Sequence, residues 1–174
     1  RAFGIDSKHR GRVLASGFPT TICEVHSDLE TDWLYGGATV WRRTVVETFP
    51  YDEWFVGTGF MEDVDYSYCV RARYRLCVVA NAKLAHYSRP VRPDRQHLLG
   101  LWQVVNRMYF VRKNRERGLS TVSATWATLG LILLNSGLAL TRADKNYLRR
   151  AIGNISGLVT VISGRSQQLG GHLK

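Results

Sequence analysis

The segment from Gly118 to Thr141 carries no charged side chain, which limits the surroundings in which it can fold. A helix needs about 20 apolar residues to cross a bilayer, so the segment is long enough to do so. However, its threonine, serine and asparagine residues dilute the hydrophobicity, and basic residues flank it on both sides. We therefore expect a helix or helical hairpin that dips into the interface of an anionic membrane. A membrane span and ordinary packing as a core helix stay open as alternatives.

The excess of positive over negative charge lies entirely in the second half of the chain. Residues 1–86 carry ten Lys and Arg against eleven Asp and Glu, a net charge of −1, whereas residues 87–174 carry fourteen against three, a net charge of +11. Such asymmetry indicates an anionic partner, for example a membrane surface, a nucleic acid or a phosphorylated ligand. A solvated basic face is the structural alternative.

The order of apolar, glycine and proline residues predicts an α/β region followed by a helical region. The expected elements are a buried strand or strand-to-helix turn at 33–41, helices at 42–47 and 62–74, a strand at 76–80, and helices at 96–117 and 142–164. The division falls near Pro90 and Pro93. We therefore predict an α/β part over residues 1–90 and a helical, basic, membrane-associated part over residues 91–174. The three cysteines contain no C-x-x-C pair, and Cys69 and Cys77 have apolar neighbours, so we expect these two to be small core residues in a reducing compartment.

An acidic pair, Glu62 and Asp63, follows a glycine-spaced loop and opens the helix expected at 62–74. Carboxylates in a first helical turn interact favourably with the helix dipole, so helix capping is one explanation for the pair. A carboxylate beside a loop with aromatic neighbours also suits a general base, which must reach the proton that it removes.

Several motifs around this pair occur in an ordered set. They are Gly36-Gly37-Ala38 with Arg42-Arg43, then Tyr51-Asp52-Glu53, then Glu62-Asp63-Val64-Asp65 with Arg71, a short strand, and His86. Over about residues 30–90 this order resembles glycosyltransferase family 2, whose enzymes have the GT-A fold. The resemblance implies an α/β protein with a partial GT-A (Rossmann-like) mixed-sheet layer, followed by a mostly α-helical C-terminal region.

Two departures from the family pattern refine this expectation. No segment resembles the nucleotide-binding half with its metal-binding D-x-D, because Asp63-Val64-Asp65 overlaps the start of a helix. We therefore expect the chain to be the C-terminal, acceptor-side part of a longer transferase, and to be inactive alone. The Q-x-x-R-W motif of processive synthases is also missing, which favours the addition of a single sugar.

The resemblance implies an inverting, non-processive hexosyltransferase that moves a sugar from a nucleotide-sugar donor to an acceptor hydroxyl. Asp63 would be the catalytic base, and the acceptor or substrate would contact Glu62, Asp65, Gly36, Gly37, Trp33 and Trp54, with Tyr35 beside Trp33 as a stacking wall. Arg89 and Arg92 would bind the diphosphate. His86 would lie near a divalent metal, Mg or Mn, held mostly by the missing half. The basic second half suggests a glycan or lipid-linked acceptor, cell-envelope polysaccharide synthesis, and a cytoplasmic location at the inner face of the cell membrane.

Two other functions are alternatives to sugar transfer. A glycoside hydrolase needs two carboxylates about 5–10 Å apart that flank the scissile bond, and the adjacent Glu62 and Asp63 cannot do so. A non-enzymatic membrane- or nucleic-acid-binding module would use the basic, aromatic segment 87–117. No nucleic-acid-binding motif accompanies that segment, so we do not expect a nucleic-acid partner.

Overall fold

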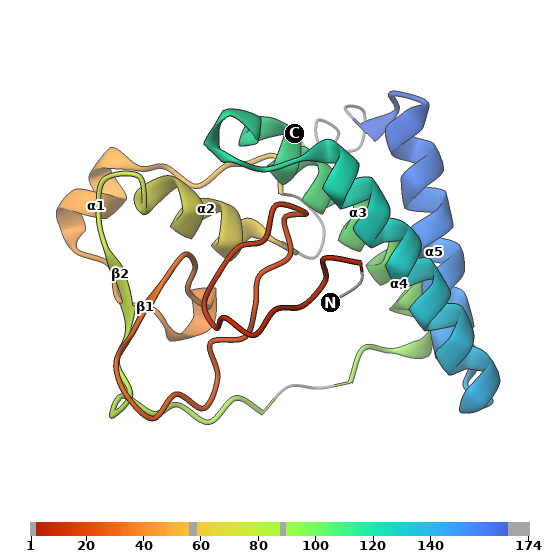
Figure 1. Ribbon diagram of the computed structural model, residues 1–174, viewed down its shortest axis with the longest axis horizontal. Coiled ribbons are helices and arrows are strands. Elements are labelled where there is room, and N and C mark those ends of the chain that lie inside the picture. Colours follow the sequence, from red (N-terminus) through yellow and green to blue (C-terminus); the bar gives the residue numbers. More distant parts are fainter. Residues whose placement is uncertain (1–2, 56–58, 88–89, 167–174) are drawn as a thin grey trace.

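The computed structural model describes residues 3–55, 59–87 and 90–166. Its elements form three layers along the long axis of the molecule (Figure 1). One end holds two short strands and two short helices, a long helix lies in the middle, and a hairpin of two long helices forms the other end. The prediction of an α/β part followed by a helical part is confirmed at this level.

The sheet is smaller than the sequence predicted. Strand β1 (Leu29–Thr31) pairs antiparallel with β2 (Leu76–Val78). Apart from a bridge between Val13 and Pro19, these two strands are the only β-structure in the described ranges. They do not form the mixed sheet expected of a GT-A layer.

The expected strand at 33–41 is instead an extended segment that contains a 3-10 turn, η1 (Gly36–Ala38). The physical reason lies in its hydrogen bonds. The backbone N–H of Leu34 donates to Ser67 Oγ at 3.0 Å, so a side chain takes the place that a neighbouring strand would fill. The glycine motif at Gly36 and Gly37 therefore lies on a turn, which is the other structure that the sequence predicts for this segment.

The short helices of this end agree with the predicted positions. Helix α1 (Arg43–Thr48) ends just before Pro50, and α2 (Glu62–Val70) begins with three acidic residues in its first turn, where the helix dipole favours negative charge. Helix α2 packs one side against the middle layer. Its residues Val64 and Tyr68 belong to the main apolar core, and the hydroxyl of Tyr68 donates to the carbonyl of Arg117 at 2.9 Å.

Three long helices make up the second half of the chain. They are α3 (Gln96–Lys113), preceded by the 3-10 turn η2 (Pro93–Arg95), α4 (Thr121–Thr141), preceded by η3 (Arg115–Arg117), and α5 (Lys145–Ile162). Gly118 adopts a left-handed φ of 92° between η3 and α4. Ser120 and Asp144 cap α4 and α5 by accepting hydrogen bonds from the backbone N–H groups of Ser123 and Asn146.

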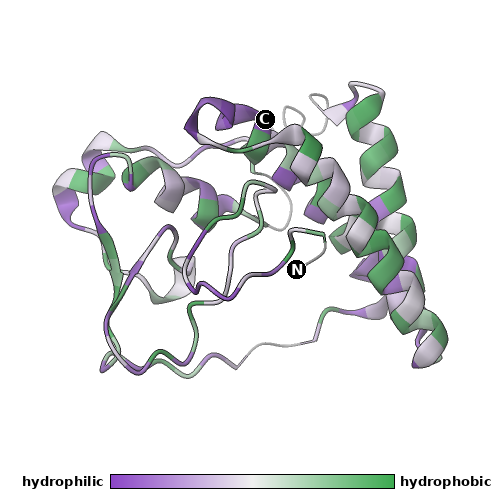
Figure 2. Ribbon diagram, in the orientation of Figure 1, coloured by the Kyte–Doolittle hydropathy of each residue, from purple (hydrophilic) through white to green (hydrophobic). Residues whose placement is uncertain are grey.

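The main apolar core lies between α2 and α3 and continues to the helical hairpin. Its largest contributions come from Trp102, Val105, Phe110 and Val111 of α3, which are at most 7% exposed. In Figure 2 hydrophobic residues occur over much of α4 and α5. Helix α3 is therefore the central element that joins the other two layers.

Helices α3 and α5 approach each other through glycines. A Cβ atom built on Gly153 would lie 2.1 Å from the carbonyl oxygen of His97, and one built on Gly100 would lie 2.3 Å from that of Arg150. Asn154 bridges the same contact, because its side-chain amide donates to the carbonyl of Gly100 at 2.9 Å. Small residues thus let the two backbones touch, a packing mode that is frequent between membrane helices.

Candidate functional site

Asp63 is held at the start of α2 by two backbone groups. Its Oδ2 accepts a hydrogen bond from the N–H of Gly36 at 3.3 Å, and its Oδ1 accepts one from the N–H of Val64 at 2.9 Å. Gly36 and Asp63 lie 27 residues apart in the chain, so tertiary folding brings together two of the motifs predicted to form one site. Glu62 neighbours Asp63 in the same first turn.

The glycine turn leaves room beside this carboxylate. A Cβ atom on Gly36 would lie 3.4 Å from the Cβ of Asp63, which is already a close contact. A Cβ atom on Gly37 would meet nothing within 4 Å, so the backbone of Gly37 faces open space. A ligand can therefore approach the backbone of the turn next to Asp63.

Two tyrosine rings lie near the carboxylate and remain partly exposed. Tyr35 is 44% exposed and packs edge-to-face on Trp33, and Tyr51 is 42% exposed and stacks on Tyr66 at 3.9 Å between ring centroids. Burial, with smaller contributions from Cys23 and Asp63, raises the pKa of Tyr35 to about 12. Burial and the charges of Glu62 and Asp63 also raise the pKa of Tyr51. Both phenols therefore stay neutral at physiological pH and can donate hydrogen bonds.

The residue before the acidic pair has an unusual backbone conformation. Met61 has a φ of 76°, in the left-handed region that favours glycine, although its side chain is 95% buried in the core. Such strain costs on the order of 1 kcal/mol or more and persists where the surrounding structure imposes it. The buried side chain of Met61 fixes the point at which α2 begins, and with it the position of Asp63.

Partial burial tunes the acidity of Asp63. It raises the pKa of this carboxyl above its ordinary value, and the hydrogen bonds from Gly36 and Val64 only partly oppose the shift. A raised pKa makes a carboxylate a stronger base, closer to what proton removal near neutral pH requires. The arrangement can accept a proton from a hydroxyl group placed between the glycine turn and the tyrosine rings.

Asp65 takes part in a separate ion cluster. Its Oδ2 lies 2.7 Å from the Nζ of Lys113, which also lies 2.7 Å from Oδ2 of Asp52. The hydroxyl of Tyr109 donates to the same oxygen of Asp52 at 2.8 Å. Asp65 is only 2% exposed, so its carboxylate ties α2 to α3. Its predicted contact with substrate stays a prediction.

The cluster shifts the pKa values of its members in different directions. Burial raises the pKa of Asp65 despite the nearby ammonium of Lys113. Burial acts in the same sense on Asp52, but hydrogen bonds from Lys113, Trp54 and Tyr109 outweigh it and lower the pKa of Asp52. The two carboxylates raise the pKa of Lys113 although burial opposes this. Lys113 is therefore the positive charge that opposes the effect of burial on the pKa of Asp65.

We expect Lys113→Met to destabilise the protein by ~2–4 kcal/mol at neutral pH, because it leaves Asp65 buried and without a counter-charge. The loss should shrink as the pH falls through the raised pKa of Asp65, since protonation removes the buried charge. Urea unfolding as a function of pH measures this difference. Lys83→Met, at an exposed position, is the control. A loss that is the same at acidic and neutral pH would contradict the role assigned to Lys113.

The two tryptophans of the predicted acceptor site occupy different surroundings. Trp33 is 4% exposed, and its indole N–H donates to the carbonyl of Thr20 at 2.9 Å, so it belongs to the core and supports Tyr35. Trp54 stacks on Tyr109 with 3.8 Å between ring centroids, which anchors the loop before α2 to α3. Neither ring forms a hydrogen bond with Asp63, whereas Gly36 does.

Within the described ranges no hydrogen bond or ion pair joins Asp63 to the residues predicted to bind diphosphate and metal. Arg92 pairs with Asp94 at 3.2 Å and borders a cavity of about 430 Å³, together with Phe60, Val91, Arg95, Leu98 and Leu99. Arg89 lies outside the described residues. His86 is exposed, and no three His, Cys, Asp or Glu side chains in the described ranges converge into a metal-binding group. His86 alone would supply one ligand of the divalent metal that the resemblance implies.

Two contributors to the site had no signal in the sequence. Ser67 positions the segment before the glycine turn through Leu34, and Lys113 supports Asp65 from a distant helix. Each acts through a contact between segments far apart in the chain. Residue type and spacing along one segment cannot reveal such contacts.

Comparisons with known protein families, with curated proteins and with solved structures find no match for this chain.

Proposed function

We propose that this chain forms the acceptor side of an inverting glycosyltransferase of the GT-A type. Asp63 is the catalytic base that takes the proton from an acceptor hydroxyl as that hydroxyl attacks the anomeric carbon of a nucleotide sugar. The observation that carries the proposal is the hydrogen bond from the Gly36 N–H to Asp63, because it joins the glycine motif to the acidic motif in one partly open site.

The geometry supplies the requirements of a base. The carboxylate is fixed by two backbone donors, lies beside open space at Gly37, and has a raised pKa. The hydroxyl groups of Tyr35 and Tyr51 can orient a polar acceptor, and their rings offer surfaces on which a sugar can stack. The bond from the anomeric carbon to the diphosphate breaks as the bond to the acceptor oxygen forms, and the proton goes to Asp63.

The proposal is tested by incubating the natural protein that contains this chain with a panel of nucleoside-diphosphate sugars and simple sugar acceptors. We expect release of nucleoside diphosphate that depends on the acceptor. The acid limb of the kcat/KM profile should lie above the usual pKa range of a carboxyl, because protonation of Asp63 removes the base. If no nucleotide sugar releases its nucleoside diphosphate, or if no acceptor accelerates that release, the result would count against sugar transfer.

A further inference from the structure

Helix α5 has its apolar and polar faces arranged in the opposite way to a helix on the surface of a water-soluble protein. From Ala151 to Ile162 every exposed residue is aliphatic: Ile152, Ile155, Val159 and Ile162, which are between 47% and 76% exposed. The buried positions of the same stretch hold small or polar residues, namely Ala151, Gly153, Asn154 and Gly157, with only Val161 as a larger aliphatic residue. A helix that faces water normally buries its large apolar side chains.

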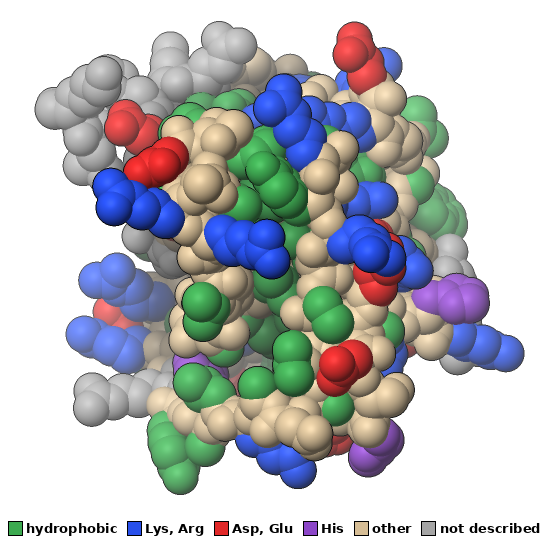
Figure 3. Space-filling view, turned by 90° about the vertical axis from the view of Figure 1, so that its left-hand side faces the viewer, with side chains coloured by type: hydrophobic (Ala, Val, Ile, Leu, Met, Phe, Trp, Pro, Cys, Tyr) green, Lys and Arg blue, Asp and Glu red, His purple; other side chains and the backbone are tan. Residues whose placement is uncertain are grey.

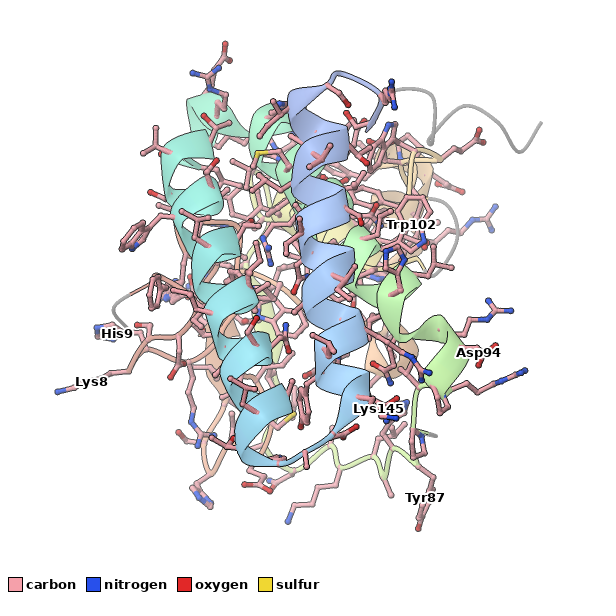
Figure 4. All side chains as sticks on the ribbon, turned by 90° about the vertical axis from the view of Figure 1, so that its right-hand side faces the viewer. Lys8, His9, Tyr87, Asp94, Trp102 and Lys145 are labelled. Carbon is pink, nitrogen blue, oxygen red and sulfur yellow. The ribbon has the colours of Figure 1, made fainter. Side chains whose placement is uncertain are left out.

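Helix α4 shows a similar arrangement. Its buried residues are Ala124, Ala127, Thr128, Gly130 and Asn135. Its large exposed side chains are Val122, Trp126, Leu129, Leu133, Leu134 and Leu140, and Thr125 and Thr141 are exposed as well. The two helices lie side by side on one face of the molecule, with the turn between them near Lys145 (Figure 4). Asn135 of α4 donates to Asn154 of α5 at 2.9 Å inside this hairpin. We call the outward sides of α4 and α5 the hairpin face.

Small residues and buried amides between helices, with large aliphatic side chains outside, are the arrangement found where lipid surrounds the helices. In hydrocarbon, burying leucine and isoleucine between helices has no advantage over leaving them in contact with acyl chains. Close backbone contact and interhelical hydrogen bonds then hold the helices together. The packing of α5 on Gly100 and Asn135 fits this case.

Charge at the ends of the hairpin indicates which lipids it meets. Arg142, Lys145 and Arg149 lie at the turn between α4 and α5, and Arg117 and Arg165 lie at the opposite end, all of them exposed. The described chain contains no ion pair for any of these five residues. From Gly118 onward the sequence has a single acidic residue, Asp144. Such ends are complementary to anionic headgroups.

The opposite end of the molecule differs. There basic and acidic side chains lie close together among apolar ones (Figure 3), as on an ordinary solvated surface. The two ends of the molecule therefore differ in charge, because acidic side chains accompany the basic ones on this end, whereas the ends of the hairpin are basic.

The packing of α3 decides how the hairpin can meet a membrane. By length and composition α4 is able to cross a bilayer, with a mean hydropathy of 1.4. However, α5 is packed against α3 from Gly100 to Val104. Helix α3 in turn carries the fully buried Arg107, and its Asn106 forms a hydrogen bond with the loop before α2. A span would draw these polar groups into hydrocarbon at high cost. An orientation with the helix axes along the surface places only the hairpin face in lipid.

We propose that the hairpin face is a monotopic membrane-binding surface, which lies in the interface of an anionic phospholipid bilayer with its basic ends on the headgroups. This inference does not depend on the proposed transfer reaction. Binding combines burial of the exposed aliphatic side chains with attraction between the basic ends and anionic lipid.

Flotation with vesicles tests the proposal. We expect the full chain to float with vesicles of phosphatidylglycerol and phosphatidylcholine, and more weakly with phosphatidylcholine alone. Ile152→Ser together with Ile155→Ser should weaken vesicle binding at least about tenfold, because less apolar surface enters the bilayer. Val40→Ser together with Leu84→Ser removes two exposed aliphatic side chains from the other end of the molecule and should leave vesicle binding unchanged.

Another double variant measures how much the basic residues contribute to vesicle binding. Arg142→Gln with Lys145→Gln should lower binding to phosphatidylglycerol vesicles and leave binding to phosphatidylcholine nearly unchanged. Oriented circular dichroism on supported bilayers should report helices parallel to the surface. Helices along the bilayer normal would overturn the monotopic orientation. Vesicle binding that survives the isoleucine changes would overturn the hairpin face as the binding surface.

The same experiments would also show whether the hairpin face binds a second copy of the chain instead of lipid. Light scattering in vesicle-free buffer would then show a dimer that Ile152→Ser with Ile155→Ser converts to a monomer, and the chain would not float with either kind of vesicle. That result would overturn the proposal and assign the hairpin face to self-association.

Discussion

Replacing Asp63 with Asn is expected to slow sugar transfer by about 10²- to 10⁴-fold, the usual contribution of a general base. The single amide oxygen can still accept the hydrogen bond from the Gly36 N–H, while the bond from the Val64 N–H is lost, so the contact between the glycine turn and α2 should be kept. The affinity for the nucleotide sugar should be retained, because the change removes the group that accepts the proton and not a contact with the nucleotide sugar. Steady-state kinetics and nucleotide binding by calorimetry measure the two effects separately.

The matched control is Glu47→Gln, which removes the same negative charge from an exposed position on α1. It should leave the rate of transfer unchanged. Unfolding temperatures of all three proteins show whether a lost rate reflects lost structure. Unchanged turnover in Asp63→Asn would remove Asp63 from the role of base, and would leave the membrane-binding inference untouched.

The second large effect is expected at Gly153, where alanine should destabilise the protein by ~3 kcal/mol. An alanine in place of a mid-helix glycine ordinarily stabilises a helix by about 0.5–1 kcal/mol. At Gly153 the added Cβ atom would lie 2.1 Å from the carbonyl oxygen of His97 and 3.0 Å from the Cα of Gly100. Both neighbours are backbone atoms, so α3 and α5 must separate and lose the hydrogen bond between Asn154 and Gly100.

Gly137 of α4 provides the control for this prediction. A Cβ atom there would meet nothing within 4 Å, so Gly137→Ala should leave the free energy of unfolding unchanged or raise it by up to about 1 kcal/mol. Urea unfolding of the two variants gives the comparison. Equal effects of the two substitutions would mean that α3 and α5 are not in close backbone contact at Gly153.

Local pattern predicted most of the helices. The acidic first turn placed the start of α2 at Glu62, and Pro93 and Gly118 bracketed the long helix that contains α3. Helix starts and ends depend on residues within a few positions of each other, so they can be read from one segment. The predicted mixed sheet was wrong in extent, because the N–H of Leu34 bonds to Ser67 rather than to a neighbouring strand.

The candidate site was predicted only in part. The sequence pattern joined Gly36 to Asp63 as members of one motif set, and the structure places them in hydrogen-bond contact. It grouped Asp65 with them, although Asp65 points to Lys113 on α3. Residues two positions apart on a helix face different directions, so adjacency in the chain does not place both carboxylates in one site.

The sequence by itself determined that the second half of the chain is helical and basic, and that the segment ahead of Arg142 is uncharged. Only the tertiary structure decided which side of each helix is buried. Periodicity shows that Ile152, Ile155 and Val159 share one side of α5, but it does not show what that side meets. The close contact of Gly153 and Gly157 with α3 buries the opposite side, because only a helix side without Cβ atoms allows the backbones to approach so closely.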